Sequence, residues 1–129
     1  MFAAADLSNI QFLQDNLSTH LEEGPSSNPR LTIRYGKGGR FARQEVSDVE
    51  LRTEKDGGAH SILIIKFVQP RVQASTFVES WPDATLTPAS PHAAGSTPYW
   101  GFKAGGRPVF VGTPRDQDLI SSVSFHRKP

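Results

Sequence analysis

The residues best suited to acid–base chemistry in this chain are one carboxylate, one arginine and one histidine that lie in or beside predicted strands. Glu50, Arg71 and His126 supply what RNA cleavage without a metal ion requires on an antiparallel sheet: a base, a phosphate-binding cation and an acid. They come from three separate segments of the chain, so only the fold can bring them together. The three residues therefore form no sequence motif; the hypothesis is that the fold places them close together.

Other catalytic and metal-binding patterns are absent from the sequence. The four histidines are scattered without HxH or HExxH spacing and the chain has no cysteine, so neither a metal nor a cofactor is expected. No serine lies in a GxSxG motif. Asp48, Glu50 and Glu54 share one face of a predicted strand, but Arg52 lies among them, and a salt-bridged outer face explains this pattern.

A short basic segment is the second place where residue types indicate binding. The glycine-rich stretch 36–40 contains Lys37 and Arg40, and Arg43 follows it. Backbone amides beside glycine, together with such cations, can hold a phosphate. The spacing matches neither a P-loop nor a dinucleotide fingerprint, and a solvated hairpin turn explains it more simply. Lys37, Arg40 and Arg43 are the predicted nucleic-acid-binding residues if the partner is RNA.

One helix is predicted near the N-terminus. Between Asp6 and Leu21, isoleucine and leucine recur every three or four residues, which places them on one face of a helix. Ser8 or Asp6 can cap the start, and Gly24-Pro25 is a stop signal. His20 then falls in the last turn of the helix as a solvated or capping residue.

Strand-like patterns follow the helix, separated by glycine and proline. The predicted strands are residues 31–35, two arms of a hairpin within 46–68, residues 72–78, and the arms 99–103 and 107–111 of a second hairpin. For residues 115–127 the sequence allows two alternatives, a helical turn at Leu119-Ile120 or a strand at 122–126.

The first hairpin is centred on Asp56-Gly57. A two-residue turn places Leu51 opposite Ile62, whereas a three-residue turn that includes Gly58 places Leu51 opposite Leu63. Its second arm, 62–68, is apolar on both faces and is therefore predicted to be a central strand. One helix can cover only one of these faces, so the other needs a curled sheet, a loop or another subunit.

A long loop and an aromatic hairpin complete the chain. Residues 81–98 contain four prolines and few charges, and a loop of this length is often an interaction arm. Tyr99, Trp100 and Phe102 follow immediately and belong either to the core or to a site.

Composition and charge limit the class of protein. The chain has 129 residues, a formal net charge of +1 and no cysteine. This length is typical of one domain, and the low charge predicts no general attraction to nucleic acid or anionic lipid. No run of about 18 apolar residues is present, so no membrane contact is expected. The lack of cysteine fits a reducing, cytoplasmic compartment.

Together these patterns predict one α+β domain over residues 1–129. Its N-terminal helix packs on a curved, mainly antiparallel sheet of about five to seven strands. The expected architecture is cystatin-like or small-barrel-like.

The leading functional hypothesis is a non-enzymatic protein–protein interaction or assembly protein, such as a viral or phage structural component located in the virion. It depends on the doubly apolar strand 62–68, the poorly charged loop 81–98 and the lack of a catalytic motif. Self-association or a larger assembly is the expected partnership, with nucleic acid less favoured. The predicted interface residues are Leu63, Ile65, Phe67, Trp81, Tyr99 and Trp100.

Two alternatives remain open. The first is a small domain that binds RNA or cleaves it without a metal. The second is an α+β domain that binds a small molecule in an aromatic pocket lined by Tyr99 and Trp100.

Overall fold

An antiparallel sheet organises this protein. The computed structural model describes residues 7, 9–41, 44–55, 61–69, 72–91, 95–104, 107–114 and 117–127. The strands in this part of the chain are β1 (Glu22–Glu23), β2 (Leu31–Lys37), β3 (Arg40–Phe41), β4 (Gln44–Glu54), β5 (Ser61–Phe67), β6 (Thr85–Thr87), β7 (Tyr99–Ala104), β8 (Arg107–Gly112) and β9 (Ser122–Arg127). The helical elements are α1 (Ile10–Leu17), α2 (Ala74–Phe77) and the 3₁₀ turn η2 (Val78–Ser80).

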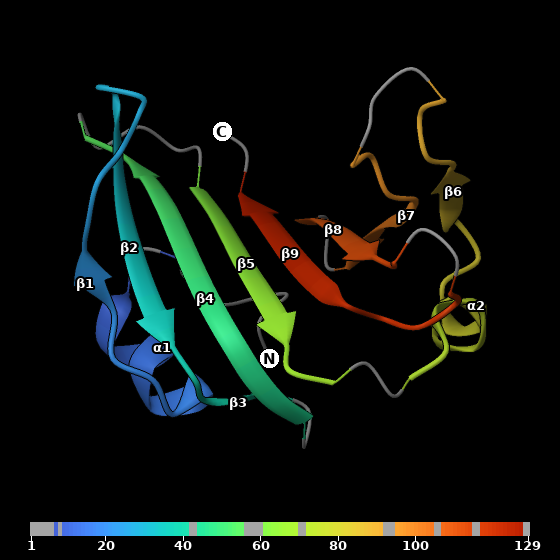
Figure 1. The fold of residues 1–129 in the computed structure, drawn as a ribbon, viewed down its shortest axis with the longest axis horizontal. Helices are drawn as coiled ribbons and strands as arrows, with labels where there is room; N and C mark the ends of the chain where they lie inside the picture. Colours follow the sequence, from blue (N-terminus) through green and yellow to red (C-terminus); the bar gives the residue numbers. More distant parts are fainter. Residues whose placement is uncertain are drawn as a thin grey trace.

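The strands form one open sheet. Its spatial order is β1-β2-β4-β5-β9-β8-β7-β6, with β3 paired to β4 outside this path (Figure 1). Every pair of neighbouring strands is antiparallel. The α+β class and the antiparallel sheet are therefore confirmed. The described residues contain nine strands where five to seven were predicted, and the sheet is open and not a closed barrel.

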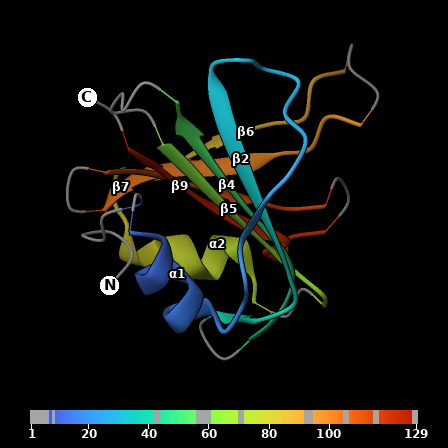
Figure 2. The same cartoon turned by 90° about the vertical axis from the view of Figure 1, so that its left-hand side faces the viewer.

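Both helices cover the same face of the sheet. Figure 2 shows α1 and α2 on one side of the strands. Leu13 and Leu17 of α1 and Ala74 of α2 join a single core cluster with buried residues of the strands, including Leu51 and Leu63. This packing buries the apolar residues that alternate along the strands, which is the main source of stability for such a sheet. The opposite face carries neither helix.

Helix α1 is shorter than the sequence predicts. It begins after Asn9, whose side chain accepts a hydrogen bond from the backbone nitrogen of Phe12 at 3.1 Å. It ends at Ser18, which adopts a left-handed conformation with φ of 52°. Leu21 is still buried, but it reaches the core from the segment after the helix. The predicted end near Gly24 is wrong because Leu21 continues the apolar spacing without being helical.

Replacing Asn9 by alanine should lower the free energy of unfolding by about 1 kcal/mol, because the helix loses its capping acceptor. Urea unfolding followed by circular dichroism measures the change. Asn9→Asp keeps an acceptor at the same place and should retain most of the stability. Equal losses in the two variants would show that the cap contributes nothing.

The first hairpin adopts the register of the three-residue alternative. Leu51 lies opposite Leu63, and Arg52 lies opposite Ile62. The pairing of Leu51 with Ile62 is therefore wrong; residues 56–60, which connect the strands, lie outside the described part of the chain. The observed register places two fully buried leucines side by side on the core face. Strand β5 lies between β4 and β9, which confirms it as a central strand.

The segment 72–78, predicted as a strand, is mainly helical: residues 74–77 form the short helix α2, Val78 starts η2, and only Gln73 makes an isolated antiparallel bridge, to Leu119. Ala74 and Val78, four residues apart, are buried on one side of this helical segment. Asp118 fixes its start, because its carboxylate accepts from the backbone nitrogen of Ser75 at 3.1 Å and also from the Ser75 hydroxyl. Apolar residues four positions apart fit one face of a helix and also one face of a strand. The sequence pattern therefore could not distinguish the two structures.

The predicted loop 81–98 contains a strand. Thr85–Thr87 form β6, which pairs with Tyr99–Gly101 of β7 at the edge of the sheet. The two hairpin arms predicted around residues 104–106 are confirmed as β7 and β8. Residues 122–127 are a strand, which settles the open alternative for the last segment.

Candidate functional site

The face of the sheet opposite the helices gathers polar and aromatic side chains from six strands. Residues directly opposite each other in antiparallel strands point to the same face, so the register identifies the members. We call this surface the open face; its main residues are Tyr35, Lys37, Asp48, Glu50, Arg52, Ile62, Ile64, Lys66, Tyr99, Lys103, Phe110, Ser122, Ser124 and His126.

Two cross-strand rows form the centre of the open face. In the first row, Ile62 of β5 lies between Arg52 of β4 and His126 of β9. In the adjacent row, Ile64 lies between Glu50 and Ser124. The two isoleucines are half-buried and form an apolar floor between polar side chains. A ligand above this floor would meet polar groups on both sides.

An ion pair occupies the β4 side of the floor. The Nε atom of Arg52 donates to Oε2 of Glu50 at 2.5 Å. The Arg52 side chain is 41% exposed and that of Glu50 is 26% exposed. This is the only polar contact of the guanidinium with the described residues, so its two terminal nitrogens remain for a ligand. Guanidinium groups with two free donors bind phosphate or carboxylate in a bidentate manner.

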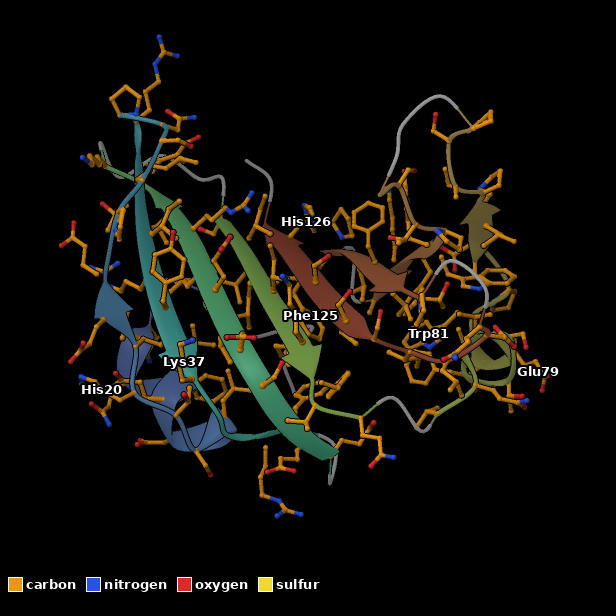
Figure 3. All side chains as sticks on the ribbon, in the orientation of Figure 1. His20, Lys37, Glu79, Trp81, Phe125 and His126 are labelled. Atoms are coloured by element: carbon orange, nitrogen blue, oxygen red, sulfur yellow. The ribbon has the colours of Figure 1, made fainter. Side chains whose placement is uncertain are left out.

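A line of rings borders the other side of the floor. Tyr99 contacts Phe110 edge-on with ring centroids 5.7 Å apart, and Phe110 contacts His126 edge-on at 4.7 Å. The His126 Nε2 atom lies 3.4 Å from the hydroxyl oxygen of Ser124. The imidazole is therefore held against the sheet beside the isoleucine floor (Figure 3).

The register places four cations and four carboxylates on the open face: Lys37, Arg52, Lys66 and Lys103 with Glu22, Asp48, Glu50 and Glu54. The Oδ1 atom of Asp48 lies 3.9 Å from the Nζ atom of Lys37, and the Glu50 carboxylate forms an ion pair with Arg52. Within the described residues, the Nζ atoms of Lys66 and Lys103 form no ion pair within 4.0 Å. Asp48 nevertheless lies opposite Lys66 in the register, and the Asp83 carboxylate accepts a hydrogen bond from the backbone nitrogen of Lys103 at 3.1 Å. The two amino groups can therefore attract an anion locally, although the open face as a whole has no excess of positive charge.

Three of the predicted interface residues lie inside the protein. Leu63 and Ile65 are completely buried, and Phe67 is nearly so. They point toward the helices, so they are not available on the surface of the folded chain. The second face of the same strand, with Ile62 and Ile64, is the one that neither helix covers.

The remaining predicted interface residues belong to the aromatic hairpin and its surroundings. Trp81 stacks on the buried Phe102, with centroids 4.7 Å apart and planes at 19°. Trp100 is half-buried and packs against the core, so both tryptophans face away from the open face. Tyr99 alone of this group lies on the open face, where it is 40% exposed.

The predicted basic residues lie away from His126. Lys37 is on the open face at the end of β2, and Figure 3 shows it and His126 near opposite ends of their strands. Arg40 is exposed in β3. Arg43 and Arg71 lie outside the described residues.

The fold places two of the three residues first considered for acid–base chemistry on the same face of the sheet, on strands separated by β5. Glu50 and His126 share the open face, and Arg52 lies next to Glu50 on that face. Sequence reasoning treated Arg52 only as a structural partner, named Phe110 only as one of the aromatic residues of the second hairpin, and did not single out Ser124. The alternation of β4 and of residues 122–126 could have indicated a shared face, but the adjacency of β5 and β9 was not predictable.

Two further properties concern metals and membranes. Among the described residues, no group of three or more His, Asp or Glu side chains is placed to hold a metal ion. None of the helices in the same residues has the length and apolarity needed to span a bilayer.

Comparisons with known proteins identify no relative. The chain matches no protein-family model, no curated protein and no solved structure.

Proposed function

We propose that this protein binds single-stranded RNA across the open face of its sheet. The observation that carries the proposal is the placement of Arg52, Ser124 and His126 around an apolar floor, beside the rings of Phe110 and Tyr99. Single-stranded RNA offers the two features that match such a face: phosphates for cationic donors and unpaired bases that stack on aromatic rings.

The polar groups on the two sides of the floor suit a phosphate. Arg52 presents two terminal nitrogens, and the Ser124 hydroxyl lies beside His126 on the opposite side. Ile62 and Ile64 keep water out from below, which strengthens hydrogen bonds to an anion. Lys66 and Lys103 add two amino groups that form no ion pair with the described residues and can contact further phosphates.

The competing assembly hypothesis has less support from the same observations. Leu63, Ile65 and Phe67 already pack in the core of this chain. Trp81 and β6 are built into the fold and do not form a separate arm. The open face could bind another protein through its isoleucines and rings, and the experiment below distinguishes this outcome.

Fluorescence anisotropy with a labelled 12-nucleotide RNA of mixed sequence, at low salt, tests the proposal. Arg52→Gln removes the central cation of the open face and should weaken binding and reduce the salt dependence by about one counterion. Phe110→Ala removes a stacking ring and should weaken binding about 5- to 100-fold.

Arg34→Gln is the matched control. It removes a cation from the same sheet, but Arg34 lies opposite the core residue Leu51 and not on the open face. Its affinity should equal that of the wild type. Absence of binding at low salt, or the same loss for Arg34→Gln as for Arg52→Gln, contradicts the proposal. A discrete oligomer in light scattering, without RNA binding, would favour assembly instead.

A further inference from the structure

We infer that the open face also cleaves the RNA it binds, by attack of a ribose 2′-hydroxyl on the adjacent phosphate, with Glu50 as base, His126 as acid and Arg52 as the phosphate-binding group. The inference rests on the proposed function, since it requires RNA to lie across Ile62 and Ile64. No residue outside the described part of the chain is needed.

Glu50 and His126 lie on the same face of the sheet, on β4 and β9, which are separated by the single strand β5. They stand in adjacent rows of the register, so two strand spacings across the sheet and two residues along it, roughly 12 Å in all, separate their backbones. A phosphate bound over Ile62 and Ile64 would therefore have the carboxylate on one side and the imidazole on the other.

The ion pair occupies only one oxygen of the Glu50 carboxylate. Arg52 Nε occupies Oε2 of Glu50, so the second oxygen, Oε1, has no hydrogen-bond partner among the described residues and is left to accept a proton. The Arg52 side chain is 41% exposed and its terminal nitrogens have no hydrogen-bond partner among the described residues, so they can hold a non-bridging phosphate oxygen. Its positive charge then opposes the negative charge that develops on the phosphate during the reaction.

The imidazole is fixed on the other side of the floor. The edge-on contact with Phe110 and the approach of the Ser124 hydroxyl hold the His126 ring in place. A ring held in this way can deliver a proton to a bound leaving group without first losing rotational freedom. The imidazolium form is the one that donates.

The reaction needs no other component. Glu50 accepts the proton of the 2′-hydroxyl as the bond between O2′ and phosphorus forms, and the bond between phosphorus and O5′ breaks. His126 gives its proton to O5′. The products are a 2′,3′-cyclic phosphate and a 5′-hydroxyl, so neither water nor a metal ion nor an oxidant is consumed.

The test is cleavage of the mixed-sequence RNA 12-mer in EDTA, with the products identified by mass spectrometry. We expect fragments ending in a 2′,3′-cyclic phosphate, and no cleavage of the same sequence with 2′-O-methyl groups. Glu50→Gln and His126→Ala should each slow cleavage by about 100-fold or more. Anisotropy with the 2′-O-methyl strand should show that Glu50→Gln still binds.

Matched controls are available for both catalytic residues. Glu79→Gln changes a carboxylate of the 3₁₀ turn η2, outside the sheet, and His20→Ala removes a histidine that lies outside the open face and pairs with Glu22 at 3.3 Å. Both should cleave at the wild-type rate, and thermal melting should show that all variants are folded.

The outcomes separate the two proposals. Binding without cleavage by the wild-type protein overturns the catalytic inference and leaves RNA binding intact. Unchanged cleavage in folded Glu50→Gln and His126→Ala, or cleavage of the 2′-O-methyl strand, also overturns it. Absence of both binding and cleavage overturns the proposed function as well.

Discussion

Replacing Leu63 by alanine is expected to lower the free energy of unfolding by about 3 kcal/mol, because the change leaves a cavity in the core. Leu63 is fully buried between Leu51 of β4 and Phe125 of β9. All three side chains face the helices, so few neighbours can move to fill the space. Chemical denaturation followed by tryptophan fluorescence measures the loss.

Ile62 is the control for this prediction. It precedes Leu63 in β5 but lies half-buried on the open face. Ile62→Ala should cost only about 1 kcal/mol, since less apolar area leaves the interior. If the two variants lose the same stability, the assignment of the two faces of β5 is wrong.

Gly39→Ala should destabilise the protein by roughly 2 to 5 kcal/mol through strain and steric overlap. Gly39 has a φ of 117°, and an added Cβ would lie 2.3 Å from the backbone oxygen of Leu17 at the end of α1. Neither backbone can move without disturbing the contact between the helix and the corner that leads from β2 to β3. Urea denaturation of the variant measures the effect.

Gly38→Ala provides the comparison at the neighbouring position. Gly38 also has a positive φ, 76°, but an added Cβ there meets no atom within 4 Å. Only conformational strain is added, so the loss should be about 1 kcal/mol. Similar losses in the two variants would show that the approach of Leu17 does not matter.

Local patterns in the sequence predicted those elements whose stabilising contacts are close in the chain. The hairpin of β7 and β8 and the alternation of residues 122–126 are examples. Both depend on a period of two and on nearby turn residues, which single-sequence reasoning can read.

Elements fixed by distant residues were not predictable in this way. Asp118 accepts hydrogen bonds at the start of α2 although it lies 43 residues away in the sequence. The residues next to Ser75 in the sequence give no indication of this contact. The end of α1 was misplaced for a related reason, since Leu21 is buried by the sheet and not by a helical continuation. In both cases tertiary contacts overrode the local pattern.

The candidate site was predictable in its residue types but not in its arrangement. Glu50 and His126 were chosen for their chemistry, and the fold places them on one face. The role of Arg52 emerged only from its contact with Glu50 and its place opposite Ile62. Arg71, chosen as the cation, lies outside the described residues.

The position of β9 has a consequence for the order in which the protein forms during its synthesis. Strands β2, β4 and β5 can pair as soon as they are made, and so can β6, β7 and β8, but these two groups are joined only through β9. Ser61 pairs with Arg127, a sequence separation that makes closure of the sheet a slow step. His126 belongs to this joining strand, so the open face is complete only after β9 has paired with both groups.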